Sequence, residues 1–183
     1  VYMPKLIEFH GITEGSGSRV YLRSLCMMLY CAVRAVQPGT ELRIEHSLAH
    51  GYYCRLEGMD SVPPETVAAI RARMEELHKA DAVFENHIGL TRDVIKHFEE
   101  QGLNSKITLL RTSRELYTKY VVLDGVFDSY YGALAPSTGY IGVFDLLPYK
   151  HGFLLMSFDP AEPSRPAQYV AQDKMYRAFT EYI

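Results

Sequence analysis

Apolar residues recur every three or four positions in two early segments of the chain, which is the pattern of an amphipathic helix. The first segment covers residues 19–36, and the dipeptide Pro38-Gly39 after it predicts where the helix stops. The second opens at Pro63-Pro64 and extends to His78. Its predicted buried face comprises Val67, Ile70, Met74 and Leu77. Both helices are therefore expected to bury one side in a core.

Alternating apolar and polar residues begin after the first helix. Residues 40–45 and 52–56 have this pattern on either side of Gly51 and predict a β-hairpin. A strand over 82–90, a helix ending at about residue 100 with Thr91 as its N-cap, and a short helix over 106–110 are expected next. Further strands are predicted at 117–123, 126–131, 140–147 and 153–158. Because helices come early and strands late, we expect an α+β fold with a mainly antiparallel sheet packed with helices.

Glycine, serine and proline mark the predicted boundaries of the domain. Residues 15–18, GSGS, are expected to form a flexible loop, and residues 159–166, DPAEPSRP, a surface linker. Beyond this linker, residues 168–183 have the spacing of an amphipathic helix that the chain end interrupts. We therefore expect a piece of a longer protein, divided into an entry segment (1–18), an α+β domain (19–158) and a lead-in to a following domain (159–183).

Composition narrows the class of protein without indicating an activity. Of the 183 residues, 48% are hydrophobic and 22% are charged, which is ordinary for a globular domain. The formal net charge of -3 excludes a global attraction to nucleic acid or to an anionic membrane. Three cysteines without regular spacing do not form a disulfide framework, and there is no apolar run long enough to span a membrane. We expect a cytoplasmic protein.

The glycine-rich GSGS segment requires a test for phosphate binding. A nucleotide-binding P-loop has the pattern G-x-x-x-x-G-K-[ST], in which backbone N–H groups and the lysine surround the phosphates. Gly11, Gly15 and Gly17 are not followed by a lysine at the required place. This chain is therefore not expected to bind ATP as a kinase does, and we assign no cofactor to it.

His46, His50 and Cys54 stand four residues apart and raise the question of a metal site. On a helix, the two histidines would share one face and be placed to hold a zinc ion. In a strand they would be separated by roughly 13 Å, too far for one ion whose ligands lie about 2 Å away. The hairpin pattern around Gly51 favours histidines in a solvent-exposed turn, so no metal is expected.

Residues 128–160 combine β-prone runs with glycine and proline breaks. The turn Ser137-Thr138-Gly139 is expected to expose hydroxyls and backbone amides. Two interpretations stay open: a tight loop at the rim of a sheet, or the rim of a small-ligand pocket lined by Tyr130 and Tyr131.

Three stretches together resemble a known family: VQPGTELRIEHSLAHGYYCRLEG, VPPETVAAIRARMEELHKADAVFENHIGLTRDVIKHFEEQG and FDSYYGALAPSTGYIGVFDLL. Their order and spacing, across about residues 19–160, resemble the second additional domain of bacterial threonyl-tRNA synthetases. In that family the domain hydrolyses mischarged seryl-tRNA. The resemblance implies the α+β fold of that domain.

The chain looks closer still to the amino-terminal part of bacterial uridine-kinase-like nucleoside kinases. RVYLRSLCMMLYCAV, IEHSLAHGYYC and YYGALAPSTGYIGVFDLLPYKHGFLL resemble that group. Its members join a ubiquitin-like TGS module, this synthetase-like domain and a carboxy-terminal P-loop kinase. The resemblance implies TGS and kinase domains as partners, and a parent transferase whose ATP and Mg act in a kinase domain outside this chain.

The resemblance also implies which residues occupy the ligand positions of the synthetase editing site. The first pair, an H-x-x-x-H on a helix, falls on Arg23 and Met27. The second pair, from C-R-G-P-H, falls on Tyr130 and Leu134. None of these four residues holds zinc in the usual way.

Asp128 and Lys106 match an aspartate and a lysine of the family and complete the candidate pocket. Because the imidazole and thiolate groups are replaced, we assign no catalytic residue and expect a binding or regulatory domain. Arg23 beside a tyrosine suits an anion, such as a nucleotide phosphate or the backbone of tRNA. The alternatives are a fragment of a threonyl-tRNA synthetase or a trans-editing deacylase, and a purely structural spacer.

Overall fold

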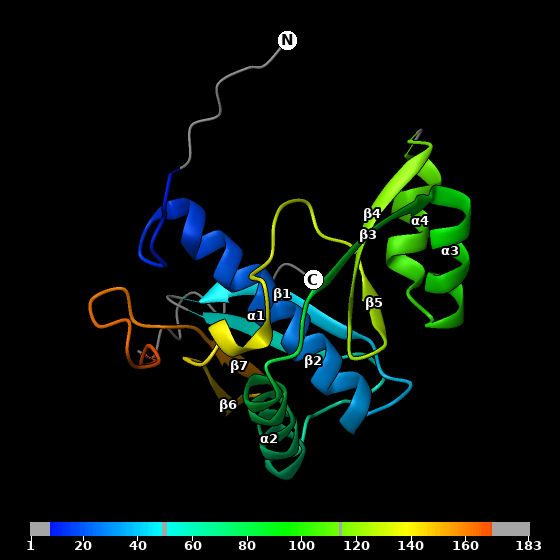
Figure 1. The fold of residues 1–183 in the computed structure, drawn as a ribbon. Helices are drawn as coiled ribbons and strands as arrows, with labels where there is room; N and C mark the ends of the chain where they lie inside the picture. The colour runs from blue at the N-terminus through cyan, green and yellow to red at the C-terminus, as the bar shows by residue number, and fades with distance from the viewer. Residues whose placement is uncertain (1–7, 49–50, 114, 170–183) are drawn as a thin grey trace.

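The computed structural model describes residues 8–48, 51–113 and 115–169 (Figure 1). The helices are α1 (Gly15–Val36), α2 (Pro64–Ala80), α3 (Thr91–Glu100) and α4 (Asn104–Thr112), with one turn of 3-10 helix at Thr138–Tyr140. The strands are β1 (Leu42–Leu48), β2 (Gly51–Leu56), β3 (Glu85–Leu90), β4 (Tyr117–Leu123), β5 (Val126–Asp128), β6 (Asp145–Tyr149) and β7 (Gly152–Met156).

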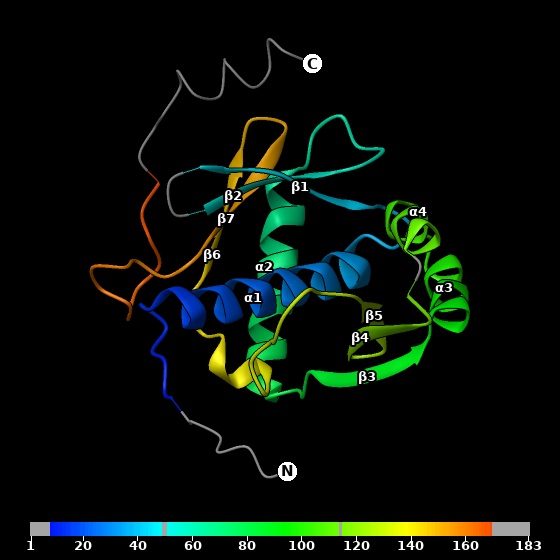
Figure 2. The same cartoon turned by 90° about the horizontal axis from the view of Figure 1, so that it is seen from above.

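These strands form two antiparallel sheets, with the orders β1-β2-β7-β6 and β3-β4-β5. Figure 2 shows α1 in the middle of the molecule, with the four-stranded sheet on one side and β3, β4 and β5 on the other. The predicted α+β class with antiparallel pairing is confirmed, although the strands are divided between two sheets. Both sheets contribute to the core around α1, and Leu25 and Met28 belong to the same cluster of buried residues as Leu123 and Phe153.

α1 begins at Gly15, so the prediction of a flexible GSGS loop is wrong and this segment is helical. The backbone N–H of Ser18 donates to the carbonyl of Glu14 at 2.8 Å and closes the first turn. Gly17 packs so closely against the carbonyl of Gly11 that a Cβ atom at position 17 would overlap it. Glycine is used here for close packing rather than for flexibility.

The next two helices form where the pattern places them. The predicted face of α2 is buried, as Val67, Ile70, Met74 and Leu77 all show. Thr91, however, is the first residue of α3 and not its N-cap, which is Leu90. The Thr91 hydroxyl donates to the carbonyl of Glu115 at 2.6 Å, so a tertiary hydrogen bond replaces the local cap.

Two late strands are shorter than predicted. The strand expected over 126–131 ends at Asp128, and the one expected over 140–147 begins only at Asp145. The chain between them crosses the molecule as a loop that packs on α1 and α2.

The turn within this loop docks on the C-terminal end of α2, which corrects the expectation of exposed hydroxyls. Thr138 is fully buried; its hydroxyl donates to the carbonyl of Leu77 at 2.5 Å and accepts the N–H of Ala82 at 2.8 Å. The Ser137 hydroxyl donates to Asp81 at 2.5 Å. This turn therefore fulfils a structural role, as the loop interpretation expects.

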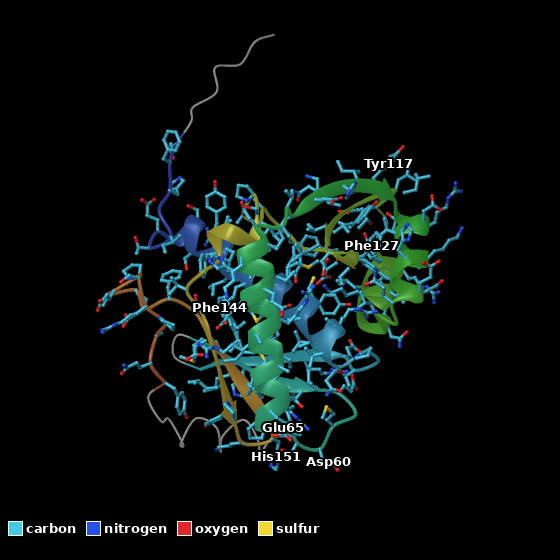
Figure 3. The ribbon with its side chains drawn as sticks, turned by 60° about the horizontal axis from the view of Figure 1, so that its bottom comes forward. Asp60, Glu65, Tyr117, Phe127, Phe144 and His151 are labelled. Carbon is cyan, nitrogen blue, oxygen red and sulfur yellow. The ribbon has the colours of Figure 1, made fainter. Side chains whose placement is uncertain are left out.

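Lys150 and His151 form the two-residue turn between β6 and β7, with Lys150 at a φ of 50°. The N–H of Val62 donates to the carbonyl of His151 at 3.1 Å and ties this turn to the start of α2. Figure 3 shows His151 at the same end of α2 as Glu65, which lies in the first turn of that helix.

The predicted surface linker, residues 159–166, leaves the sheet after β7 and returns to it. Phe158 and Pro166 form a bridge, and the N–H of Ala167 donates to the carbonyl of Ser157 at 2.8 Å. Residues 170–183, which hold most of the helix predicted over 168–183, lie outside the described residues. Within the described ranges, no helix combines the length and the apolar character needed to cross a bilayer.

Candidate functional site

A pocket of about 430 Å³ lies between α1, the β1–β2 hairpin, α4 and the end of β5. We call it the Lys106 pocket. Its wall is apolar for the most part and carries two cationic and two acidic side chains. The lining residues are Leu22, Arg23, Cys26, Tyr30, Glu41, Leu42, Ile44, Tyr52, Leu103, Lys106, Asp128 and Tyr130.

Lys106 and Asp128 form an ion pair in the wall of this pocket. Asp128 is 3% exposed, and its carboxylate also accepts the N–H of Ser129 at 2.6 Å. The ammonium of Lys106 lies 5.0 Å from the centre of the Tyr130 ring, within range of a cation–π contact. Burial lowers the pKa of Lys106 to about 8, whereas the adjoining carboxylate favours the charged ammonium.

Arg23 lies on α1 and holds the loop that follows β5. Its Nη1 donates to the carbonyl of Ala133 at 2.5 Å, and the guanidinium lies directly against Gly132. Gly132 has a φ of 122°, and a Cβ atom there would be 2.5 Å from Nη1. The neighbouring Ser24 accepts the N–H of Ala135 at 2.8 Å. Two adjacent residues of α1 thus position the loop that carries Tyr130 into the pocket.

The structure brings four of the six predicted site residues together and places the other two elsewhere. Arg23, Lys106, Asp128 and Tyr130 line the Lys106 pocket. Met27 has no exposed surface and belongs to the core, and Leu134 is half-buried against the same core. These two positions contribute packing rather than pocket wall.

Sequence reasoning missed several lining residues that helical spacing indicates. Cys26 and Tyr30 follow Arg23 by three and seven positions, so they share its face of α1. Tyr52 enters from β2 on the opposite side. Burial raises the pKa of Cys26 to about 12, so its thiol stays protonated and a poor nucleophile at neutral pH.

The described residues of the histidine motif, His46 and Cys54, do not line this pocket. His46 lies in β1, its ring 5.4 Å from that of Tyr53, while Cys54 is buried in the core. His50 lies outside the described residues. Among the residues that the structure describes, no group of three or more His, Cys, Asp or Glu side chains is arranged to hold a metal ion.

Of the two tyrosines proposed as a pocket rim, only one has that place. Tyr130 lines the Lys106 pocket, whereas Tyr131 is 82% exposed.

The structure is an α+β domain with antiparallel sheets, and comparison with known proteins shows its similarity to threonyl-tRNA synthetases. The chain is 31% identical over 135 residues to the threonine–tRNA ligase of Carboxydothermus hydrogenoformans, covering 73% of this chain and 21% of the ligase. It is 36% identical over 112 residues to that of Maricaulis maris, covering 61% of this chain and 17% of the ligase. No family model matches the chain. The chain spans about a fifth of the length of these relatives.

Proposed function

We propose that this domain binds the adenosine end of an aminoacylated tRNA, or a related adenine nucleotide, in the Lys106 pocket without a metal ion. The observation that carries the proposal is the meeting of Lys106, Asp128 and Arg23 in one largely apolar pocket flanked by Tyr52 and Tyr130. Tyrosine rings suit a purine base, and the two cations suit a phosphate or carboxylate. A volume of about 430 Å³ is within the range of small-molecule sites.

The pocket wall supports binding more strongly than catalysis. Its described lining contains no histidine, and its one thiol stays protonated because it is buried. Ester hydrolysis requires a group that positions and activates water. The resemblance to threonyl-tRNA synthetases implies that the positions which supply such groups in that family are occupied here by Arg23, Met27, Tyr130 and Leu134.

Adenosine 5′-monophosphate is the direct probe of this proposal. We expect calorimetry to give a measurable affinity that falls with Lys106→Met and with Arg23→Gln. Lys96→Met, an exposed lysine on α3, is the matched control. Because burial lowers the pKa of Lys106 to about 8, its positive charge is lost above that pH, so affinity should fall as the pH rises from 7 to 9. Absence of binding, or binding that neither substitution weakens, would refute the proposal.

A second candidate function is hydrolysis of mischarged aminoacyl-tRNA, as a fragment of a threonyl-tRNA synthetase or as a separate deacylase. The similarity to threonine–tRNA ligases favours it, as does the retained Lys106–Asp128 pair. Incubation with seryl-tRNA and alanyl-tRNA decides between the two candidates. Rapid release of the amino acid that Asp128→Asn abolishes would favour hydrolysis over binding alone.

The parent protein is a separate proposal. A uridine-kinase-like nucleoside kinase with TGS and P-loop domains, using ATP and Mg, is supported by the sequence resemblance, whereas the relatives found by comparison favour a ligase. The continuation of the gene distinguishes them. A G-x-x-x-x-G-K-[ST] motif would support the kinase, and class II synthetase motifs would support the ligase.

A further inference from the structure

A second, smaller hollow adjoins the Lys106 pocket along α1. It has a volume of about 160 Å³ and lies between the N-terminal half of α1, the β1–β2 hairpin and the end of β7. We call it the serine annex because three serines contribute to its wall. Its lining residues are Ser18, Leu22, Ser47, Gly51, Tyr52, Ser157, Phe158 and Pro160.

Ser157 is the feature of the annex that requires an explanation. Ser157 directly follows β7 and lines the annex together with Phe158, which belongs to the core around α1. The residue is 5% exposed, and its hydroxyl has no hydrogen-bond partner among the described residues. A buried hydroxyl without a partner destabilises a fold, so its presence beside a hollow points to a ligand.

The wall of the annex limits the chemistry of that ligand. None of the eight lining residues that the structure describes carries a charge, which disfavours an ammonium, a carboxylate or a phosphate. The hydroxyls of serine both donate and accept hydrogen bonds, and Leu22, Phe158 and Pro160 supply apolar contacts. This combination suits a small neutral group that has a hydroxyl or a carboxamide on a short carbon chain.

We propose that the serine annex binds such a group through a hydroxyl, and that Ser157 is the residue that recognises this hydroxyl. Leu22 and Tyr52 line both hollows, so the annex opens beside the Lys106 pocket. One ligand therefore spans both, with the small neutral group in the annex and the nucleotide in the larger pocket. This second statement rests on the proposed function, whereas the recognition by Ser157 does not.

The test compares glycolamide with propanamide, two probes of nearly equal size that differ by a hydroxyl in place of a methyl group. Binding is followed by two-dimensional amide NMR of the chain at millimolar probe concentrations. We expect glycolamide to shift the signals of Ser157, Ser47 and Tyr52 and to bind roughly three- to tenfold more tightly than propanamide. Ser157→Ala should abolish this preference, while Ser61→Ala, on an exposed turn, should leave it unchanged.

The outcomes separate this inference from the proposed function. The proposal for the annex would be refuted by equal binding of the two probes, by the absence of shifts around Ser157, or by a preference that survives Ser157→Ala. This holds whether or not adenosine 5′-monophosphate binds. A hydroxyl preference that Ser157→Ala removes would support the annex even if the nucleotide fails to bind. Since Ser157→Ala removes a buried hydroxyl without a partner among the described residues, its melting temperature should equal or exceed that of the parent chain, which excludes unfolding as the cause.

Discussion

Replacement of Lys106 by methionine is the most direct perturbation of the candidate site. It removes the cation beside Asp128, whose side chain is 5% exposed, and leaves a buried carboxylate with the N–H of Ser129 as its remaining hydrogen-bond donor among the described residues. Loss of one partner from a fully buried ion pair costs about 3–5 kcal/mol. The Lys106 side chain is 30% exposed, so water can reach the site and reduce this cost. We expect a loss of about 2 kcal/mol in the free energy of unfolding.

The assay is urea unfolding followed by circular dichroism, with thermal unfolding as a second measurement. For a chain of this length, a loss of about 2 kcal/mol corresponds to a fall of roughly 4 to 8 °C in melting temperature. In the variant, Asp128 has lost its cation, and burial then favours its protonated form. The destabilisation should therefore be full at pH 7 and should diminish as the pH falls toward 4, where the carboxyl takes up a proton.

Two further variants test whether the Lys106–Asp128 ion pair contributes to stability. Lys106→Met combined with Asp128→Asn removes both charges, and we expect this pair to be more stable than Lys106→Met alone at pH 7. Lys96→Met, on the exposed face of α3, should change stability by less than about 0.5 kcal/mol. If Lys106→Met were as stable as the control, or if its loss of stability did not diminish at low pH, the ion pair would not contribute to the stability of the fold.

Three other predictions concern the walls around the pocket. Gly132→Ala places a Cβ against Arg23 at a φ of 122° and should cost about 1–3 kcal/mol by urea unfolding, with weaker nucleotide binding. Thr138→Val removes the hydroxyl that accepts the Ala82 N–H and should cost about 1–3 kcal/mol; an unchanged urea midpoint would contradict this. Cys26, whose pKa burial raises to about 12, should react with iodoacetamide at pH 8 far more slowly in the native chain than in urea, as mass spectrometry would show.

Local sequence patterns correctly predict the helices and hairpins that depend on interactions between residues close together in the chain. The 3.6-residue spacing of Val67, Ile70, Met74 and Leu77 correctly predicts the buried face of α2, because a helix presents every third or fourth side chain to the same side. The β1–β2 hairpin is predicted equally well, since alternation and turn residues act between near neighbours. The α+β class follows from the order of these elements.

Contacts between distant residues decided what the patterns did not. The Thr91 hydroxyl bonds to the carbonyl of Glu115 instead of capping its helix, and the Thr138 hydroxyl bonds to the carbonyl of Leu77 instead of facing solvent. The candidate site, too, depends on contacts between residues that are far apart in the sequence.

The Lys106 pocket is made by α1, β1, β2, α4 and the end of β5, elements that meet only when the two sheets pack around α1. The family resemblance indicated Arg23, Lys106, Asp128 and Tyr130, but it could not separate them from Met27, which occupies the core. Nor could it indicate Ser157, because only the folded structure shows that its hydroxyl is buried without a partner among the described residues. The sequence alone determines which side chains the protein has, whereas tertiary packing decides which of them are buried away from water. Burial increases the free energy that a polar side chain gains from a partner or loses without one.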